Sequence, residues 1–144
     1  MARVRASNEF ESLAVAPDGR KRAFTARGEV FAASVKDGGD AVRVTRTPAV
    51  EGALAWAPDS QRLVYSAARG ERRALYLFDF ASDEETAITG GEGDDYSPVF
   101  SPDGKQVAFV RDGKQLRVVT LASREQRLVA TAELPVAFDV DRAI

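Results

Sequence analysis

A short Pro-Asp motif recurs three times at nearly constant spacing, and this repeat constrains the fold more than any other feature of the sequence. Its prolines, Pro17, Pro58 and Pro102, lie 41 and then 44 residues apart. The apolar residues around them keep one register: Val15, Trp56 and Phe100 precede the prolines by two residues, and Phe24, Tyr65 and Phe109 follow them by seven. Because a chance Pro-Asp pair would not carry a shared frame, each unit is predicted to be one copy of the same structure.

Each motif has the chemistry of a tight turn between two strands. Proline presets φ at the first corner, aspartate accepts backbone hydrogen bonds, and glycine takes the left-handed conformation that closes a bulged hairpin. Gly19 and Gly104 hold the glycine position in the first and third units, but Ser60 holds it in the second. A serine at positive φ is strained by about 1 kcal/mol, so we expect the second turn to be the least regular.

Each unit is predicted to form four short strands. They span residues 12–16, 22–26, 29–35 and 41–45, then 52–57, 62–67, 74–79 and 86–89, then 96–101, 106–111, 115–121 and 126–130. Inner segments such as 107–110 are nearly continuously apolar, whereas fourth segments such as 41–45 alternate and carry charge. A strand that is apolar on both faces must be covered on both faces. Four strands in about 40–45 residues, with a charged outer strand, indicate an all-β fold, a β-propeller of about three four-stranded blades.

The expected organisation is a single partial β-propeller over residues 1–144. Its blades would span about 11–46, 52–90 and 96–131, with the start of a further blade at 135–144. Propellers have about four to eight blades, so three do not easily close a ring. Two explanations stay open: the chain is a piece of a longer parent, or two copies pair head-to-tail as a homodimer that closes a six-bladed ring. The predicted core comprises Leu13, Val15, Phe24, Leu54, Trp56, Leu63, Tyr65, Leu75, Leu77, Phe100, Val107, Phe109, Leu116 and Val118.

Composition narrows the chemistry that the chain can perform. It has no cysteine and no histidine, which removes disulfides, thiolates, the commonest general base and the commonest metal ligand. Its 20 basic and 22 acidic residues give a net charge of -2, without the basic excess that nucleic acid binding favours. No apolar run is long enough for a membrane span. The N-terminus does not resemble a signal peptide, which slightly favours the cytoplasm over the periplasm. We expect no catalytic residues, metal or cofactor.

Candidate binding residues fall in loops that are predicted to share one rim of the propeller. The loops that join a fourth strand to the next first strand, and the loop at 67–73, should emerge on that rim. Mixed arginines and carboxylates there would bind peptide termini or a partner protein, with ordinary solvated loops as the alternative. The candidates are Arg46, Arg69, Arg72, Arg73, Glu92, Asp94 and Asp95.

Other polar or aromatic features favour structural roles. The acidic group at 92–95 lacks the alternating oxygen ligands of a calcium loop. Asp139 and Asp141 share a strand face, but such pairs are common on surfaces, so they make weak candidates for hydrolytic carboxylates. Trp56 lies in register with apolar residues of the other units, which predicts core packing rather than a stacking platform for a ligand.

The stretches at 55–59 (Ala-Trp-Ala-Pro-Asp) and 98–105, with the apolar run at 107–110, resemble the WD40-like PD40 repeats of TolB-type and tricorn-type propellers. This resemblance covers about residues 11–130. A narrower one, at 20–31 and 116–125, is to the propeller region of tricorn-like serine peptidases. It implies a non-catalytic module that guides peptides towards a separate peptidase portion. A TolB-like protein-binding scaffold, and an excised or engineered fragment without independent activity, are the alternatives.

Overall fold

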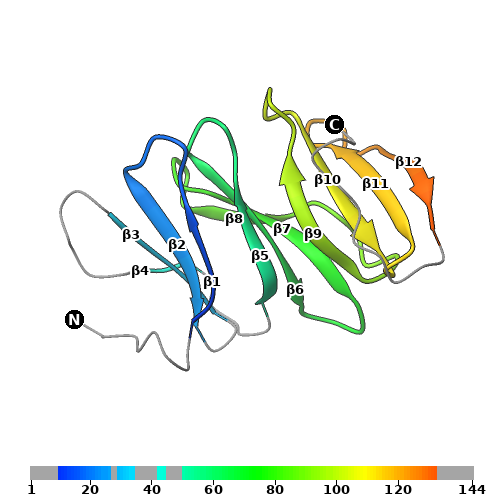
Figure 1. The fold of residues 1–144 in the computed structure, drawn as a ribbon, viewed down its shortest axis with the longest axis horizontal. Helices are drawn as coiled ribbons and strands as arrows, with labels where there is room; N and C mark the ends of the chain where they lie inside the picture. Colours follow the sequence, from blue (N-terminus) through cyan, green and yellow to red (C-terminus); the bar gives the residue numbers. More distant parts are fainter. Residues whose placement is uncertain (1–9, 27–28, 35–41, 45–49, 133–144) are drawn as a thin grey trace.

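The computed structural model describes residues 10–26, 29–34, 42–44 and 50–132. These residues form twelve strands in three four-stranded antiparallel sheets, one for each sequence unit (Figure 1). The first sheet contains β1 (Phe10–Val15), β2 (Lys21–Ala26), β3 (Glu29–Ser34) and β4 (Val42–Arg43); the second β5 (Val50–Trp56), β6 (Arg62–Ala68), β7 (Arg73–Asp79) and β8 (Glu84–Ala87); the third β9 (Asp95–Phe100), β10 (Gln106–Arg111), β11 (Gln115–Thr120) and β12 (Gln126–Thr131). The predicted all-β fold, a partial propeller, is confirmed. The described residues include no helix, and therefore none that could cross a membrane.

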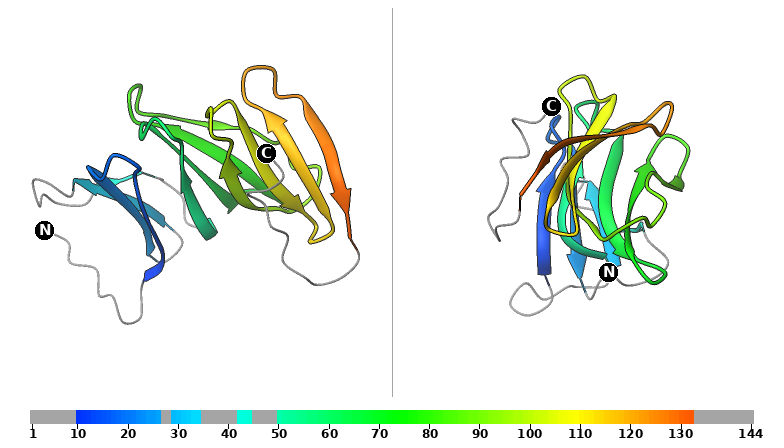
Figure 2. Two further views of the ribbon diagram at one scale, coloured as in Figure 1. Left: turned by 45° about the horizontal axis from the view of Figure 1, so that its top comes forward. Right: turned by 90° about the vertical axis from the view of Figure 1, so that its right-hand side faces the viewer.

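The three sheets stand side by side as blades 1, 2 and 3 (Figures 1 and 2). Within each blade the strands follow chain order, and β5 contacts both β1 and β9, so the first strands of the blades lie innermost. We call the face of a blade that points to the next blade in the chain its forward face, and the opposite face its rear face. The further blade expected at 135–144 lies outside the described residues.

The three Pro-Asp turns share one hydrogen-bond pattern. Gly19, Ser60 and Gly104 have φ values of 74°, 60° and 73°. Each donates its amide to the carbonyl three residues earlier, at 2.8–3.0 Å. The second turn, which was expected to be the least regular, has the smallest φ and the longest of these hydrogen bonds but keeps the pattern of the other two. Ser60 is buried, and its Oγ accepts the Asp18 amide of blade 1 at 3.0 Å. That bond between blades compensates for the strained backbone of a serine at positive φ.

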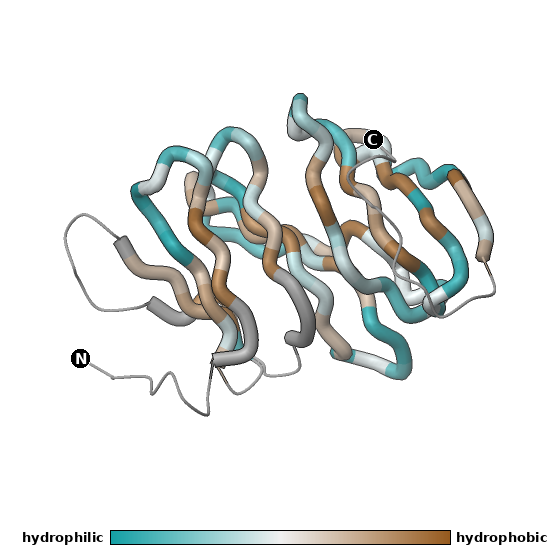
Figure 3. The backbone as a smooth tube through the Cα atoms, viewed as in Figure 1, coloured by the Kyte–Doolittle hydropathy of each residue, from teal (hydrophilic) through white to brown (hydrophobic). Residues whose placement is uncertain are grey.

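Two apolar clusters fill the spaces between the blades. Between blades 1 and 2 they include Ala23, Val30, Leu54, Leu63, Tyr65, Ala67 and Phe78. Between blades 2 and 3 they include Ala57, Val64, Leu75, Ile88, Phe100, Val107, Phe109 and Val119. Figure 3 shows hydrophobic residues along the strands and hydrophilic residues at many of the turns. The inner strand β6 of blade 2 is apolar on both faces, and a neighbouring blade covers each of them.

Two of the predicted core residues are exposed. Leu13 and Val15 are 62% and 56% exposed, so their assignment to the core was wrong. Both lie on the rear face of blade 1, where the described residues supply no preceding blade. Trp56 and Leu77 are half-buried, and the other ten predicted core residues are buried.

Candidate functional site

A pocket of about 480 Å³ opens on the rim of blade 2, between the β6–β7 loop and the loop that follows β8. Its lining comprises Arg69, Gly70, Glu71, Arg72, Ala74, Tyr76, Ala87, Thr89, Gly90 and Gly91. Two segments about 20 residues apart in the sequence therefore form one concave surface. Among the residues predicted to bind a partner, Arg69 and Arg72 line this pocket.

One wall of the pocket is a fixed arginine stacked on an aromatic ring. The Arg69 guanidinium lies 4.3 Å from the centre of the Tyr76 ring and donates to both carboxylate oxygens of Glu85, from Nη2 at 2.9 Å. The Tyr65 hydroxyl donates to the same carboxylate. Burial raises the pKa of Tyr65, and the neighbouring Glu85 charge raises it further. The Arg69 Nε is buried without a hydrogen-bond partner. The Glu85 carboxylate and the Tyr76 ring thus hold the guanidinium in place without a ligand.

The lip of the pocket carries an exposed charge. The Arg72 side chain is 54% exposed, and its ion pair with Asp112 spans 3.9 Å. A pair this long and exposed contributes little to stability. Glu71, the adjacent residue, is also exposed. Arg72 can therefore exchange its contact with Asp112 for a ligand carboxylate at small cost.

Beneath the lip, Arg73 points inward and joins blades 2 and 3. Its Nε donates to Ser66 Oγ and its Nη2 to the Ser66 carbonyl, both at 3.1 Å. Its amide donates to Asp94 Oδ1 at 2.8 Å, and its guanidinium lies 5.3 Å from the centre of the Tyr96 ring. Ser66 Oγ in turn donates to the Asp95 carbonyl at 2.6 Å. Arg73 is buried, so in this structure it orders the rim rather than lining the pocket.

The buried centre of this polar network is an ion pair. Arg111 donates from Nε and Nη2 to the two carboxylate oxygens of Asp95, at 2.8 and 3.2 Å. Asp95 is fully buried and Arg111 is 6% exposed. Burial raises the pKa of Asp95, and the Arg111 guanidinium opposes that rise. Asp95 is thus a structural anchor at the start of β9.

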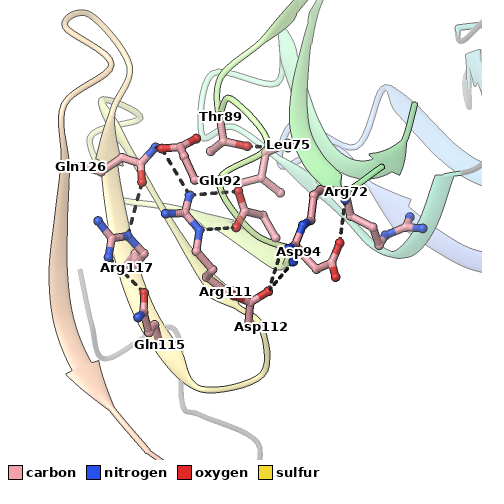
Figure 4. A network of polar contacts seen from close by, with 12 residues as sticks. Arg72, Leu75, Thr89, Glu92, Asp94, Arg111, Asp112, Gln115, Arg117 and Gln126 are labelled. Atoms are coloured by element: carbon pink, nitrogen blue, oxygen red, sulfur yellow. Dashed lines mark hydrogen bonds and ion pairs between the residues drawn. The ribbon is translucent and has the colours of Figure 1, made fainter. Parts of the chain in front are cut away.

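The loop that enters β9 is held by further contacts (Figure 4). Glu92 accepts the Gly90 amide at 2.9 Å and Gln126 Nε2 at 3.3 Å. Its pKa is lowered by the Gly90 amide and by the Arg111 charge, which outweigh its slight burial. The Asp94 amide donates to Asp112 Oδ1 at 2.8 Å. These residues shape the loop that forms one side of the pocket.

The structure places only part of the predicted site in one location. Arg69 and Arg72 line the pocket, Arg73, Glu92, Asp94 and Asp95 support it, and Arg46 lies outside the described residues. Sequence reasoning missed Tyr76 and Glu85, which fix Arg69, because the contact between a loop and an outer strand leaves no local signal. Within the described ranges, no group of three or more acidic side chains is placed to hold a metal ion.

No protein-family model matches the chain. Over 74 residues it is 32% identical to the Tol-Pal system protein TolB of Francisella tularensis subsp. holarctica, a match covering 48% of this chain and 17% of TolB. An uncharacterized protein of Agrobacterium fabrum is 37% identical over 54 residues, which cover 38% of this chain and 18% of that protein. The chain therefore matches less than a fifth of the length of these relatives.

Solved structures resemble the chain over most of its length. A putative TolB from Agrobacterium tumefaciens superimposes with a TM-score of 0.74 at 22% identity, over 88% of this chain and 47% of that one. TolB from Acinetobacter baumannii superimposes with a TM-score of 0.72 at 19% identity, over 92% of this chain and 34% of that one. The tricorn protease superimposes with a TM-score of 0.66 at 16% identity, over 78% of this chain and 14% of the protease. In agreement with the PD40-type repeats, the described residues form three propeller blades of the kind found in TolB and the tricorn protease.

Proposed function

We propose that this chain is a non-catalytic protein- or peptide-binding propeller module and that the rim pocket of blade 2 is its contact surface. The observation that carries the proposal is the pairing, in one concave site, of an exposed arginine with a rigid arginine–tyrosine stack. Concave sites with a few fixed polar groups are the usual place for recognition.

The pocket chemistry suits an extended peptide segment. Arg72 would bind a carboxylate, either a side chain or a peptide C-terminus. Tyr76 offers an aromatic surface to an apolar side chain. An added Cβ at Gly70 or Gly91 would meet no other atom within 4 Å, so a ligand backbone has room to approach there.

Two versions of this function are supported by different comparisons. The similarity to TolB in sequence and in structure favours a protein-binding scaffold. The similarity to the tricorn protease supports the second candidate, a propeller module that guides peptide substrates of a peptidase. A scaffold should prefer one sequence pattern, whereas a guiding module should bind many unrelated peptides weakly.

An array of short peptides, followed by fluorescence anisotropy titrations of the bound ones, tests the proposal. We expect Arg72→Glu to weaken binding about tenfold, the loss of one favourable ionic contact worth about 1.4 kcal/mol. Arg127→Glu is the matched control, because Arg127 is an exposed arginine on β12, outside the pocket, and should bind like the wild type. Circular dichroism melts would show that both variants fold.

The array pattern then separates the two versions. Binding confined to one sequence pattern supports the scaffold, and weak binding to many sequences supports the guiding module. Equal affinities of the Arg72→Glu and Arg127→Glu variants, or an array without any bound peptide, would contradict the assignment of the pocket.

A further inference from the structure

The outer strand of blade 2 leads directly into the rim pocket. β8 is the outermost strand of its sheet, and all four of its residues are exposed. Its last residue, Ala87, lines the pocket, and so do Thr89, Gly90 and Gly91, which continue the chain beyond the strand. A ligand that follows the edge of β8 therefore reaches the pocket without a break.

The ladder between β7 and β8 shows which backbone groups of β8 are free to pair. The Ile88 amide donates to the Leu75 carbonyl at 2.9 Å. The adjoining pair in the ladder is Tyr76 with Ala87. Because hydrogen-bonded and non-hydrogen-bonded pairs alternate in an antiparallel ladder, the N–H and C=O groups of Ala87 and Glu85 point away from β7. Within the part of the chain that the structure describes, no strand pairs with this edge.

The other two outer strands are less suited to pairing. β4 has only two residues. β12 has six, but the register of its ladder with β11 shifts between Leu116 and Arg117, so a bulge interrupts the strand. Bulges protect a sheet edge from pairing because they twist it away. β8, in contrast, pairs with β7 in unbroken register over its four residues. Among the described outer strands, β8 thus offers the regular edge.

The two ends of this edge carry opposite charges. The exposed residues Asp83 and Glu84 lie where β8 begins. At the other end, the exposed Arg72 lies on the lip of the pocket. Complementary charges fix the register in which a partner binds. The edge therefore fits a strand with a basic side chain near Glu84 and a carboxylate near Arg72.

We propose that β8 receives an extended peptide as a fifth strand of blade 2, with a carboxylate of the peptide at Arg72 and a basic side chain beside Glu84. The proposal rests on the function proposed above, because the rim pocket is one end of the same site. Main-chain hydrogen bonds to Glu85 and Ala87 supply affinity, and the pocket and the two charges supply the choice of sequence.

Two substitutions at Ala87 test the pairing, with anisotropy titrations of the tightest-binding peptide from the array. Proline removes the outward N–H, whereas valine adds a similar volume to the pocket and keeps the N–H. We expect Ala87→Pro to bind about tenfold more weakly than Ala87→Val, the loss of one main-chain hydrogen bond. Thermal melts should show both variants folded, because proline is tolerated on an edge strand where its nitrogen faces outward.

The peptide and the strand each give a second readout that side-chain binding alone would not move. Copies of the peptide that are methylated at one backbone nitrogen at a time should lose affinity at every second position, because alternate residues of a strand pair with β8. Hydrogen exchange measured by NMR should slow at the Glu85 and Ala87 amides when the peptide saturates the chain, but not at Thr86, which faces β7.

The outcomes separate this inference from the function on which it rests. Equal affinities of Ala87→Pro and Ala87→Val, or methylation effects without a period of two residues, would overturn the strand addition, even if Arg72→Glu still weakens binding. Binding that is unaffected by Arg72→Glu would overturn both, since both place a carboxylate of the peptide at that arginine.

Discussion

The two interfaces between blades join sheets with the same strand order, but the side chains that fill them differ in chemistry. Between blades 1 and 2, the aromatic rings come from blade 2: Trp56 stacks on Phe80 at 5.3 Å, and Phe80 meets Phe78 edge-on at 4.8 Å. Blade 1 contributes the small apolar residues Ala23 and Val30 to the same cluster. Between blades 2 and 3, by contrast, the apolar cluster is joined by a buried polar network centred on Asp95 and Arg111. One backbone repeat therefore accepts either kind of contact.

The difference explains where the pocket lies. Apolar contacts are non-directional, so they hold two sheets together without fixing the loops at their ends. Charged hydrogen bonds are directional, and the bond from the Arg73 amide to Asp94 fixes both loops that form the rim. The loops of the candidate site are thus ordered by polar contacts to blade 3, whereas Tyr76 in its lining packs against the apolar cluster between blades 1 and 2.

The largest expected effect is at the polar interface. Asp95→Ala should lower the free energy of unfolding by about 3–5 kcal/mol, because it leaves the Arg111 charge buried without its partner. Urea denaturation measures this loss. The double variant Asp95→Leu/Arg111→Met should recover most of the lost stability, because it leaves no buried charge without a partner. A double variant as unstable as Asp95→Ala would show that the pair is not the source of the effect.

The aromatic interface gives the next largest effect. Trp56→Ala should cost about 3 kcal/mol, the low end for a tryptophan deletion because Trp56 is half-buried. Val15→Ala, at the equivalent position of blade 1, should change stability by less than about 0.5 kcal/mol, because Val15 is 56% exposed. The same denaturation experiment compares the two variants. Equal losses would mean that the two faces are covered to the same extent.

The hydrogen bond from Tyr65 to Glu85 lies at the back of the pocket and gives a smaller effect with a distinct pH dependence. Tyr65→Phe should cost about 1–2 kcal/mol at neutral pH. Because burial raises the pKa of the folded hydroxyl above its unfolded value of 10.0, the wild type keeps its full stability below pH 10. Above that pH the unfolded state loses the proton first, so stability falls. Unfolding curves on both sides of pH 10 should show a steeper fall for the wild type than for Tyr65→Phe, and parallel falls would contradict this account.

The smallest effect concerns the turn that joins the two interfaces. Ser60→Ala removes the acceptor of the Asp18 amide but keeps a side chain at positive φ, so it should cost about 1 kcal/mol. Ser60→Gly loses the same bond but relieves the backbone strain, and should stay within about 0.5 kcal/mol of the wild type. Thermal unfolding in parallel scans would rank the two. A glycine variant that is less stable than the alanine variant would contradict the assignment.

The sheets could be predicted from the sequence because their signals are local. Turn chemistry at Gly19 and Gly104, and apolar runs such as 107–110, each specify a hairpin within a few residues. Whether a side chain is buried depends on contacts outside its own sequence unit. Leu13 was assigned to the core from its place in the repeat, but its exposure depends on whether another blade covers it, and that information lies outside the unit.

The candidate site was only partly predictable for the same reason. The shared rim follows from the strand order, and it brings the Arg69 and Arg72 loop beside Gly90 and Gly91. Which arginine turns inward does not follow from the strand order. Arg73 differs from Arg72 because strand alternation sends it towards Ser66, and the register that decides this is set by pairing between strands.

The most direct test of the central claim is an NMR titration of the chain with a peptide selected on the array. Recognition by the rim pocket predicts amide shift changes that cluster at residues 69–76 and 87–91 and that disappear in the Arg72→Glu variant. Changes that cluster on another surface instead, such as the rear face of blade 1, or that persist in the Arg72→Glu variant, would contradict it.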